Sequence, residues 1–279
     1  MTVADLPPLW TPPKPAIFRS GADLLRPGYF PSQIATRAEA RAILTDLVRA
    51  GRLTRDQAKH ASLLLSIVGW SSRIGGNDAY TKLLLHCDGT NGSTTFTDSS
   101  ASAHTVTANG GAAVSTSVYK FPTGSAGFNG TNANLTVGNQ ADWAFGTGDF
   151  TIDFWFYANA LNYNLCGSTI GGTVSTGISA SKLYVDRSGT GTIITGTTVL
   201  STGVWYHVAL VRSSGSIKLY LNGTQEGSTY STSFTAYGPA IYGSGNGANY
   251  FNGYEDEIRV SNGIARWTAN FTPPTQAYG

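Results

Sequence analysis

The clearest pattern of apolar and polar positions lies in Gly148–Ala158, a stretch rich in aromatic and β-branched residues that favours a β-strand. Successive side chains of a strand point to opposite faces. One row is wholly apolar: Phe150, Ile152, Phe154 and Phe156. The other row is mixed: Thr151, Asp153, Trp155 and Tyr157. We therefore predict a strand of a two-sheet sandwich, with its apolar row against the opposing sheet and its mixed row facing water, where a ligand would bind.

The remainder of residues 80–279 consists of short strand-like runs separated by turn residues, with no helical pattern between them. The predicted strands are Thr81–Cys87, Val118–Phe121, Asn134–Val137, Phe150–Tyr157, Lys182–Asp186, Tyr206–Arg212, Ile217–Leu221, Ala240–Gly243 and Gly253–Val260. Ser213–Ser216 and Asn222–Gly223 are typical of hairpin turns. The pattern predicts an all-β fold for residues 80–279, a two-sheet antiparallel sandwich of the jelly-roll type.

Residues 1–35 differ from the rest because seven prolines interrupt them, which excludes a regular helix and favours extended backbone. Trp10, Phe18, Tyr29 and Phe30 stand between the prolines. A disordered linker is usually poor in aromatic residues. We interpret residues 1–35 as an extended anchoring arm that lies along a partner surface, and a loose tail is the alternative.

Residues 36–69 have the period of two short helices. Thr36 and Thr54 each begin a capping box, and Gly51 stands where the first helix would end. Two short helices bury little surface by themselves, so they would need the β domain, a symmetry mate or a host surface. We predict a helical hairpin and linker over residues 36–79.

The composition excludes some classes of function. Charged residues make up 12% of the 279 residues and the net charge is +2, which gives no electrostatic reason to expect nucleic acid. The charge is uneven: residues 1–80 carry a net +4 and residues 81–279 a net −2, which supports a domain boundary near residue 80. The sequence contains no membrane span and no signal peptide, so we expect a protein made in a host cytoplasm. Cys87 and Cys166 form no disulfide framework or zinc pattern.

Several blocks in order carry a family resemblance. They are Leu83–Thr90, Phe128–Gly130, Phe145–Trp155, Trp205–Arg212, Leu219–Gly223, Tyr254–Val260 and Ala265–Pro274. Together they resemble the laminin-G-like, concanavalin A-like jelly roll in the version common in virion proteins of tailed bacteriophages. The resemblance covers residues 80–278, and the ending Ala-Arg-x-x-Ala-x-Phe-x-Pro-Pro is typical of phage virion proteins.

The resemblance implies a metal site. In such domains the carboxylate of the opening Asp-Gly and one from the last strand can hold a structural Ca²⁺, and the matching residues here are Asp88 and Asp256. Carboxylate and carbonyl oxygens suit this hard cation. The alternative is that Asp88 caps a turn and Asp256 accepts hydrogen bonds from the backbone.

A glycan site is a second hypothesis, because an aromatic platform beside polar groups is typical of sugar recognition. Asp153, Trp155 and Tyr157 share a face and are the candidate residues, unless these aromatics only pack at the rim of the sandwich. Polysaccharide hydrolysis requires a pair of carboxylates across the sugar. Glu255 and Glu257 share a face in a regular strand, but the string of three acids found in related glucanases is missing. We therefore expect no enzyme activity.

Assembly is the function that the sequence favours. We expect a non-enzymatic bacteriophage structural protein, a capsid decoration or a tail or fibre accessory, located in the virion. Residues 1–79 would attach to capsid or tail proteins and the jelly roll would face outward, in a homo-oligomer for which a trimer is one option. The alternative is a glycan-binding adhesion module for a host-surface polysaccharide. Capsid or tail attachment, the symmetry, the sugar and the presence of Ca²⁺ stay open.

Overall fold

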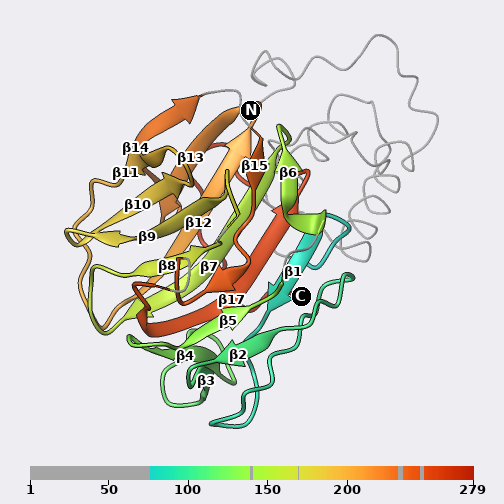
Figure 1. Cartoon of the computed structure of the whole chain (residues 1–279), viewed down its shortest axis with the longest axis vertical. Helices are drawn as coiled ribbons and strands as arrows, with labels where there is room; N and C mark the ends of the chain where they lie inside the picture. The colour runs from blue at the N-terminus through green and yellow to red at the C-terminus, as the bar shows by residue number, and fades with distance from the viewer. Residues whose placement is uncertain (1–75, 139–140, 169, 232–234, 246–247) are drawn as a thin grey trace, which may run out of the picture. The chain divides into compact units, whose positions relative to one another are not determined.

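The computed structural model describes residues 76–138, 141–168, 170–231, 235–245 and 248–279, which form an all-β sandwich (Figure 1). By its contacts the chain divides between Gly76 and Asn77, and the description below concerns the second part. The predicted arm (1–35) and helical hairpin (36–69), with most of the linker up to residue 79, lie outside the described residues. Among the described residues, no helix is long and apolar enough to cross a membrane.

The larger of the two sheets contains eight described strands in the order β14-β13-β12-β7-β17-β4-β3, and β1 pairs with β17 in addition. These strands are β1 (Thr81–Leu85), β3 (Ala113–Ser115), β4 (Ser125–Asn129), β7 (Phe150–Ala158), β12 (Trp205–Ser213), β13 (Ser216–Leu221), β14 (Thr224–Ser231) and β17 (Asn252–Asn262).

The smaller sheet contains seven described strands in the order β11-β10-β9-β8-β16-β5-β2. They are β2 (Thr107–Asn109), β5 (Asn134–Thr136), β8 (Asn164–Gly167), β9 (Val174–Ser179), β10 (Lys182–Arg187), β11 (Gly191–Thr195) and β16 (Ile241–Tyr242). A two-stranded ribbon joins β6 (Ala144–Gly146) to β15 (Ala236–Tyr237), and a 3₁₀ turn, η3, spans Ala141–Trp143. Neighbouring strands within each sheet pair antiparallel, which confirms the predicted two-sheet sandwich.

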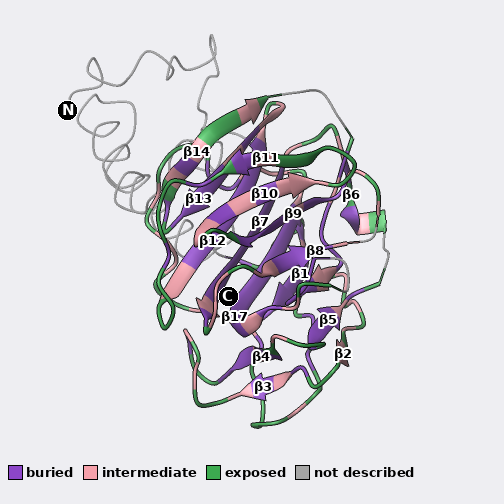
Figure 2. Ribbon diagram, turned by 60° about the vertical axis from the view of Figure 1, so that its left-hand side comes forward, coloured by how far each residue is buried: buried purple, intermediate pink, exposed green. Residues whose placement is uncertain are grey.

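The strand β7 lies at the centre of the larger sheet, between β12 and β17. Its apolar row, Phe150, Ile152, Phe154 and Phe156, is buried in the core between the two sheets, as its alternation predicts. Figure 2 shows β7, β12 and β17 as mostly buried ribbons. The reason is that β7 has partners on both edges and apolar contacts on the core face.

The prediction that the other face of β7 is wet is wrong. Thr151 and Asp153 are fully buried and Trp155 is 6% exposed, while only Tyr157 is half-buried. The segment that follows β17 packs over this face: the Trp267 and Phe271 rings stack at 4.1 Å, and His207 on β12 contacts both. Covering this face removes large aromatic surfaces on both sides from water, which is favourable by about 25 cal/mol per Å².

The predicted strand Val118–Phe121 is also wrong, because these residues form a loop. The Asp256 carboxylate accepts hydrogen bonds from the backbone N–H groups of Lys120 and Phe121, at 2.8 and 3.0 Å, which takes both donors away from strand pairing. The strand that pairs with β17 in this part of the sheet is β4. The other eight predicted strands are present, with ends that differ by up to two residues. The sequence pattern missed the strands β2, β3, β4, β6, β8, β9, β11, β14 and β15, most of which are short and poor in large apolar residues.

A bulge in β17 divides one of its edges between two partners. Asn252–Glu255 pairs with β4, Ile258–Ser261 pairs with β1, and the register against β7 shifts between Asp256 and Arg259. Glu257, at the bulge, has a φ of 51°. One extra residue reverses the alternation of faces beyond it. Glu255 lies opposite Phe156 on the core side, whereas Glu257 binds His86 and the backbone of Tyr278. The expectation that the two glutamates share a face is therefore wrong.

Candidate functional site

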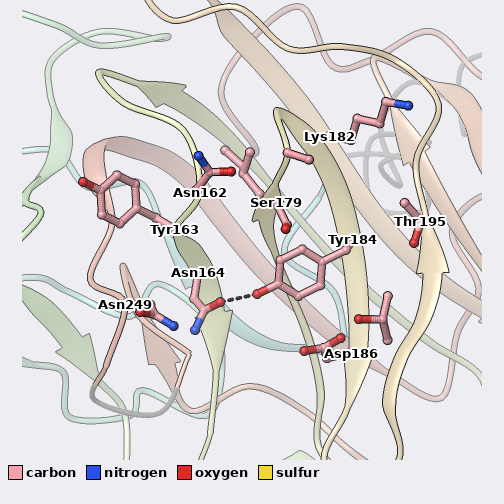
Figure 3. Close-up of a pocket in the computed structure, with 12 residues that line it drawn as sticks. Asn162, Tyr163, Asn164, Ser179, Lys182, Tyr184, Asp186, Thr195 and Asn249 are labelled. Carbon is pink, nitrogen blue, oxygen red and sulfur yellow. Dashed lines mark hydrogen bonds between the residues drawn. The ribbon is translucent and has the colours of Figure 1, made fainter.

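A pocket of about 700 Å³ opens on the outer side of the smaller sheet, over β8, β9, β10 and β11 (Figure 3). The alternation of β10 builds its floor. Leu183 and Val185 enter the core, so Lys182, Tyr184 and Asp186 point the other way, toward the pocket. The remaining lining residues are Asn162, Tyr163, Asn164, Ile178, Ser179, Ala180, Thr192, Thr195 and Asn249.

A glycine lets the Tyr184 ring lie close against the sheet. Gly177 on β9 is the direct cross-strand partner of Tyr184. A Cβ atom at residue 177 would approach the Tyr184 hydroxyl oxygen to 2.6 Å, which is closer than carbon and oxygen tolerate. The glycine thus leaves space for an aromatic ring to lie across the neighbouring strand, with one ring face toward the pocket.

The Tyr184 hydroxyl donates a hydrogen bond to Oδ1 of Asn164, as the dashed line in Figure 3 shows. Burial, with a smaller contribution from Asp186, raises the pKa of Tyr184 to about 12, so the phenol stays neutral at pH 7. Because Oδ1 of Asn164 is used as an acceptor, its amide nitrogen is left to donate to a ligand. The pair therefore presents one oriented donor beside an aromatic face.

Asp186 is the single carboxylate among the described lining residues of this pocket. Its Oδ1 is buried and has no hydrogen-bond partner. An unpaired buried acceptor costs about 1–3 kcal/mol, which a hydroxyl group of a bound ligand would recover. An aromatic face, amide groups and one acceptor without a donor together suit a ligand rich in hydroxyl groups.

The sequence pattern did not single out any residue of this pocket as functional. It predicted the strand Lys182–Asp186, and the polar row Lys182, Tyr184 and Asp186 on that strand was the available signal. The pattern could not predict that Asn164 and Gly177 lie beside Tyr184, because it did not predict their strands, β8 and β9.

The residues that the sequence predicted for glycan binding lie elsewhere. Asp153 is fully buried and accepts two hydrogen bonds from Arg259, and the Arg259 charge holds the pKa of Asp153 at about 2 in spite of burial. Tyr157 packs half-buried against Trp205 and Tyr254. Trp155 borders a second pocket on the larger sheet. Of the three, only Trp155 lines a described pocket, and glycan contact by this set stays a prediction.

The predicted Ca²⁺ ligands, Asp88 and Asp256, both bind the loop before β4. Oδ1 of Asp88 accepts hydrogen bonds from the backbone N–H and the hydroxyl of Thr123, and Oδ2 of Asp256 accepts two backbone N–H groups. Burial, with smaller contributions from Glu257 and Asp88, raises the pKa of Asp256 to about 7. Oδ1 of Asp256 is buried and has no hydrogen-bond partner.

The two carboxylates are ligands of the type that Ca²⁺ prefers, but two carboxylates alone are too few to complete its coordination shell. Among the described residues, no group of three or more His, Cys, Asp or Glu side chains is arranged to hold a metal ion. Ca²⁺ takes six to eight oxygen ligands, so backbone oxygens and water would have to complete the shell. The metal site stays a prediction.

The described fold agrees with a family comparison. The Laminin_G_3 family model, described as the "Concanavalin A-like lectin/glucanases superfamily", matches residues 129–267. The chain is thus similar to this superfamily over that range, which lies within the residues that carried the resemblance in the sequence. No curated protein matches the chain.

Solved structures are similar to part of this chain. The binding domain of Paraclostridial Mosquitocidal Protein 1 is 17% identical, with a TM-score of 0.54 over 67% of this chain and 50% of that one. Domain 4 of AbnA, an extracellular arabinanase from Geobacillus stearothermophilus solved with arabinotriose, is 17% identical, with a TM-score of 0.48 over 61% and 87%. The binding domain of botulinum neurotoxin serotype D is 13% identical, with a TM-score of 0.49 over 67% and 49%.

The chain spans about half the length of each toxin domain that it matches. At 17% identity, the likeness to the domain of Paraclostridial Mosquitocidal Protein 1 concerns the fold alone. The site chemistry must therefore be argued from the residues of this chain.

Proposed function

We propose that the described domain is a non-catalytic binding module that holds a neutral glycan in the pocket over β8–β11. The observation that carries the proposal is the Tyr184 ring, which Gly177 allows to lie across β9 beside the amide of Asn164 and the unpaired oxygen of Asp186. A sugar ring could stack on the tyrosine, while its hydroxyl groups donate to Asp186 and accept from Asn164.

The arrangement favours binding over hydrolysis. Glycoside hydrolysis uses two carboxyl groups about 5–9.5 Å apart across the scissile bond. The described lining of this pocket supplies one, Asp186, with Lys182 as the single cation. One acid and one base give no net charge, which suits a neutral sugar.

A glycan array probed with the full chain tests the proposal. We expect binding to neutral glycans, and we expect Tyr184→Ala to abolish it because the stacking face is lost. Tyr119→Ala is the matched control, since Tyr119 is an exposed tyrosine, 43% accessible, outside the pocket. A blank array, or equal binding by both variants, would remove the pocket as a glycan site.

For the whole chain, we propose that this module is the outward-facing part of a bacteriophage virion protein, attached to capsid or tail proteins through residues 1–79. The proposal is supported by the ordered sequence blocks that resemble phage jelly rolls, Ala265–Pro274 above all. Deletion of residues 1–35 should prevent incorporation into particles while glycan binding is kept. Incorporation of the shortened chain at the normal level would contradict the anchoring role.

A further inference from the structure

A second pocket, of about 650 Å³, lies on the larger sheet and shares no described residue with the neutral-glycan pocket. Trp155 on β7, Trp205 at the start of β12 and the Pro273–Pro274 segment give it aromatic and flat apolar surfaces. The remaining lining residues are Lys120, Phe121, Asn222, Thr272 and Thr275. This pocket contains no carboxylate among its lining residues, whereas the first contains Asp186.

The cation of this pocket has no anionic partner. The Lys120 ammonium lies 4.0 Å from the centre of the Trp155 ring, half-buried, and no described carboxylate is within ion-pair distance of it. Asp256 accepts a hydrogen bond from the backbone of Lys120, not from its ammonium. A partly desolvated ammonium over an indole is held in place by the ring and is still available to an anion.

Asn222 supplies a second donor to the same pocket. Oδ1 of Asn222 accepts a hydrogen bond from the backbone of His207, so the Asn222 amide nitrogen is left to donate. Lys120 and Asn222 therefore each offer a donor to a ligand in this pocket, and a ligand that satisfies both must carry acceptors.

We propose that this pocket binds a sugar that carries a carboxylate, of the uronic-acid class. Lys120 and Asn222 would bind the carboxylate, and the sugar ring would pack against Trp205 and the face of the prolines. Charge-assisted hydrogen bonds are about twice as strong as neutral ones, so the carboxylate supplies much of the selectivity. The two tryptophans favour a sugar ring over a simple inorganic anion, which needs no stacking surface.

Calorimetric titration of the full chain with trigalacturonic acid, compared with its methyl ester, tests the proposal. The two ligands share the same sugar rings, and the ester carries an uncharged methyl ester in place of each carboxylate. We expect the ester to bind about ten-fold more weakly or worse, the size of one charged hydrogen bond, and the affinity for the acid to fall with added salt. Lys120→Gln should cause a similar loss and Lys120→Arg a smaller one. Lys182→Gln, in the other pocket, should leave the affinity unchanged.

Thermal unfolding of each variant checks that the fold is intact before affinities are compared. Equal binding of acid and ester, or a Lys120→Gln variant that keeps the full affinity, would overturn the proposal. So would a peptide with a free terminal carboxylate that binds as tightly as the sugar acid. Tyr184→Ala should not weaken the binding of the acid, which separates failure at this pocket from failure of the neutral-glycan proposal.

Discussion

Arg259 on β17 and Asp153 on β7 form a bidentate ion pair between two adjacent strands of the larger sheet. The Arg259 Nε and Nη2 atoms each donate to a different oxygen of Asp153 at 3.0 Å, and both side chains are fully buried. The Tyr278 hydroxyl donates to the same carboxylate, and its ring lies 3.9 Å from the guanidinium carbon. Through these contacts, Asp153 and Arg259 hold the segment that contains Tyr278 against the face of β7.

Removing the charge of Asp153 should strongly destabilise the domain. We expect Asp153→Asn to lower the free energy of unfolding by about 3–5 kcal/mol, because a buried guanidinium is left without its counter-ion. Urea unfolding followed by tryptophan fluorescence measures the change. Asp149→Asn on the loop before β7, where a half-buried carboxylate accepts one bond from Ser214, should cost about 1 kcal/mol or less. Equal losses in the two variants would contradict a special role for the ion pair.

The pair of Asp153 and Arg259 also makes the stability of the domain depend on pH in the acid range. The folded pKa of Asp153, about 2, lies below its ordinary value of 3.8, so its contribution is complete above pH 4 and is lost as the pH falls toward 2. Burial also lowers the pKa of His207, which costs stability once the unfolded chain takes up protons below about pH 6.5. Between pH 7 and 4 the raised pKa values of Asp256 and Glu255 oppose the contribution of His207. We therefore expect the urea midpoint to fall as the pH drops from 4 toward 2, where only the contribution of Asp153 is being lost among these groups. In Asp153→Asn this fall should be smaller.

Replacement of Glu255 should stabilise the domain, whereas replacement of Asp153 should destabilise it. The Glu255 carboxyl faces the core, neither oxygen has a partner at hydrogen-bond geometry, and burial raises its pKa well above 4.5. The neutral form is favoured in the fold, so its contribution is lost as the pH rises above 4.5. We expect Glu255→Leu to raise the free energy of unfolding at pH 7 by about 1–3 kcal/mol. A less stable variant would show that the carboxyl has a partner in the core.

Calcium binding can be tested at Asp88 and Asp256. We expect about 1 mM Ca²⁺ to raise the unfolding midpoint by about 2–4 °C relative to a chelator, because the ion would relieve the repulsion between the two carboxylates. Mg²⁺ at the same concentration is the control cation. Asp88→Asn should remove the response at little cost to the fold, since Asp88 is exposed. An unchanged midpoint in the wild-type protein would exclude the metal site.

The sandwich could be predicted from the sequence because strand alternation and turn residues are patterns within short stretches of the chain. The alternation in β7 and β12 is strong, and the turn Asn222–Gly223 lies where the hairpin turns from β13 to β14. Strands such as β9 and β11 were missed because glycine, serine and threonine carry little apolar alternation. The pocket over β8–β11 was therefore not predictable, although its row Lys182, Tyr184 and Asp186 was visible.

By itself the sequence determined which residues form the central strand and which of its rows faces the core, because alternation along one strand fixes both. Only the tertiary structure decided what covers the other row. The segment with Trp267 and Tyr278 lies more than 100 residues from Asp153 in the chain, and a bulge at Glu257 reverses the faces of β17. Contacts at such separations depend on packing of the whole sandwich, and no local pattern encodes them.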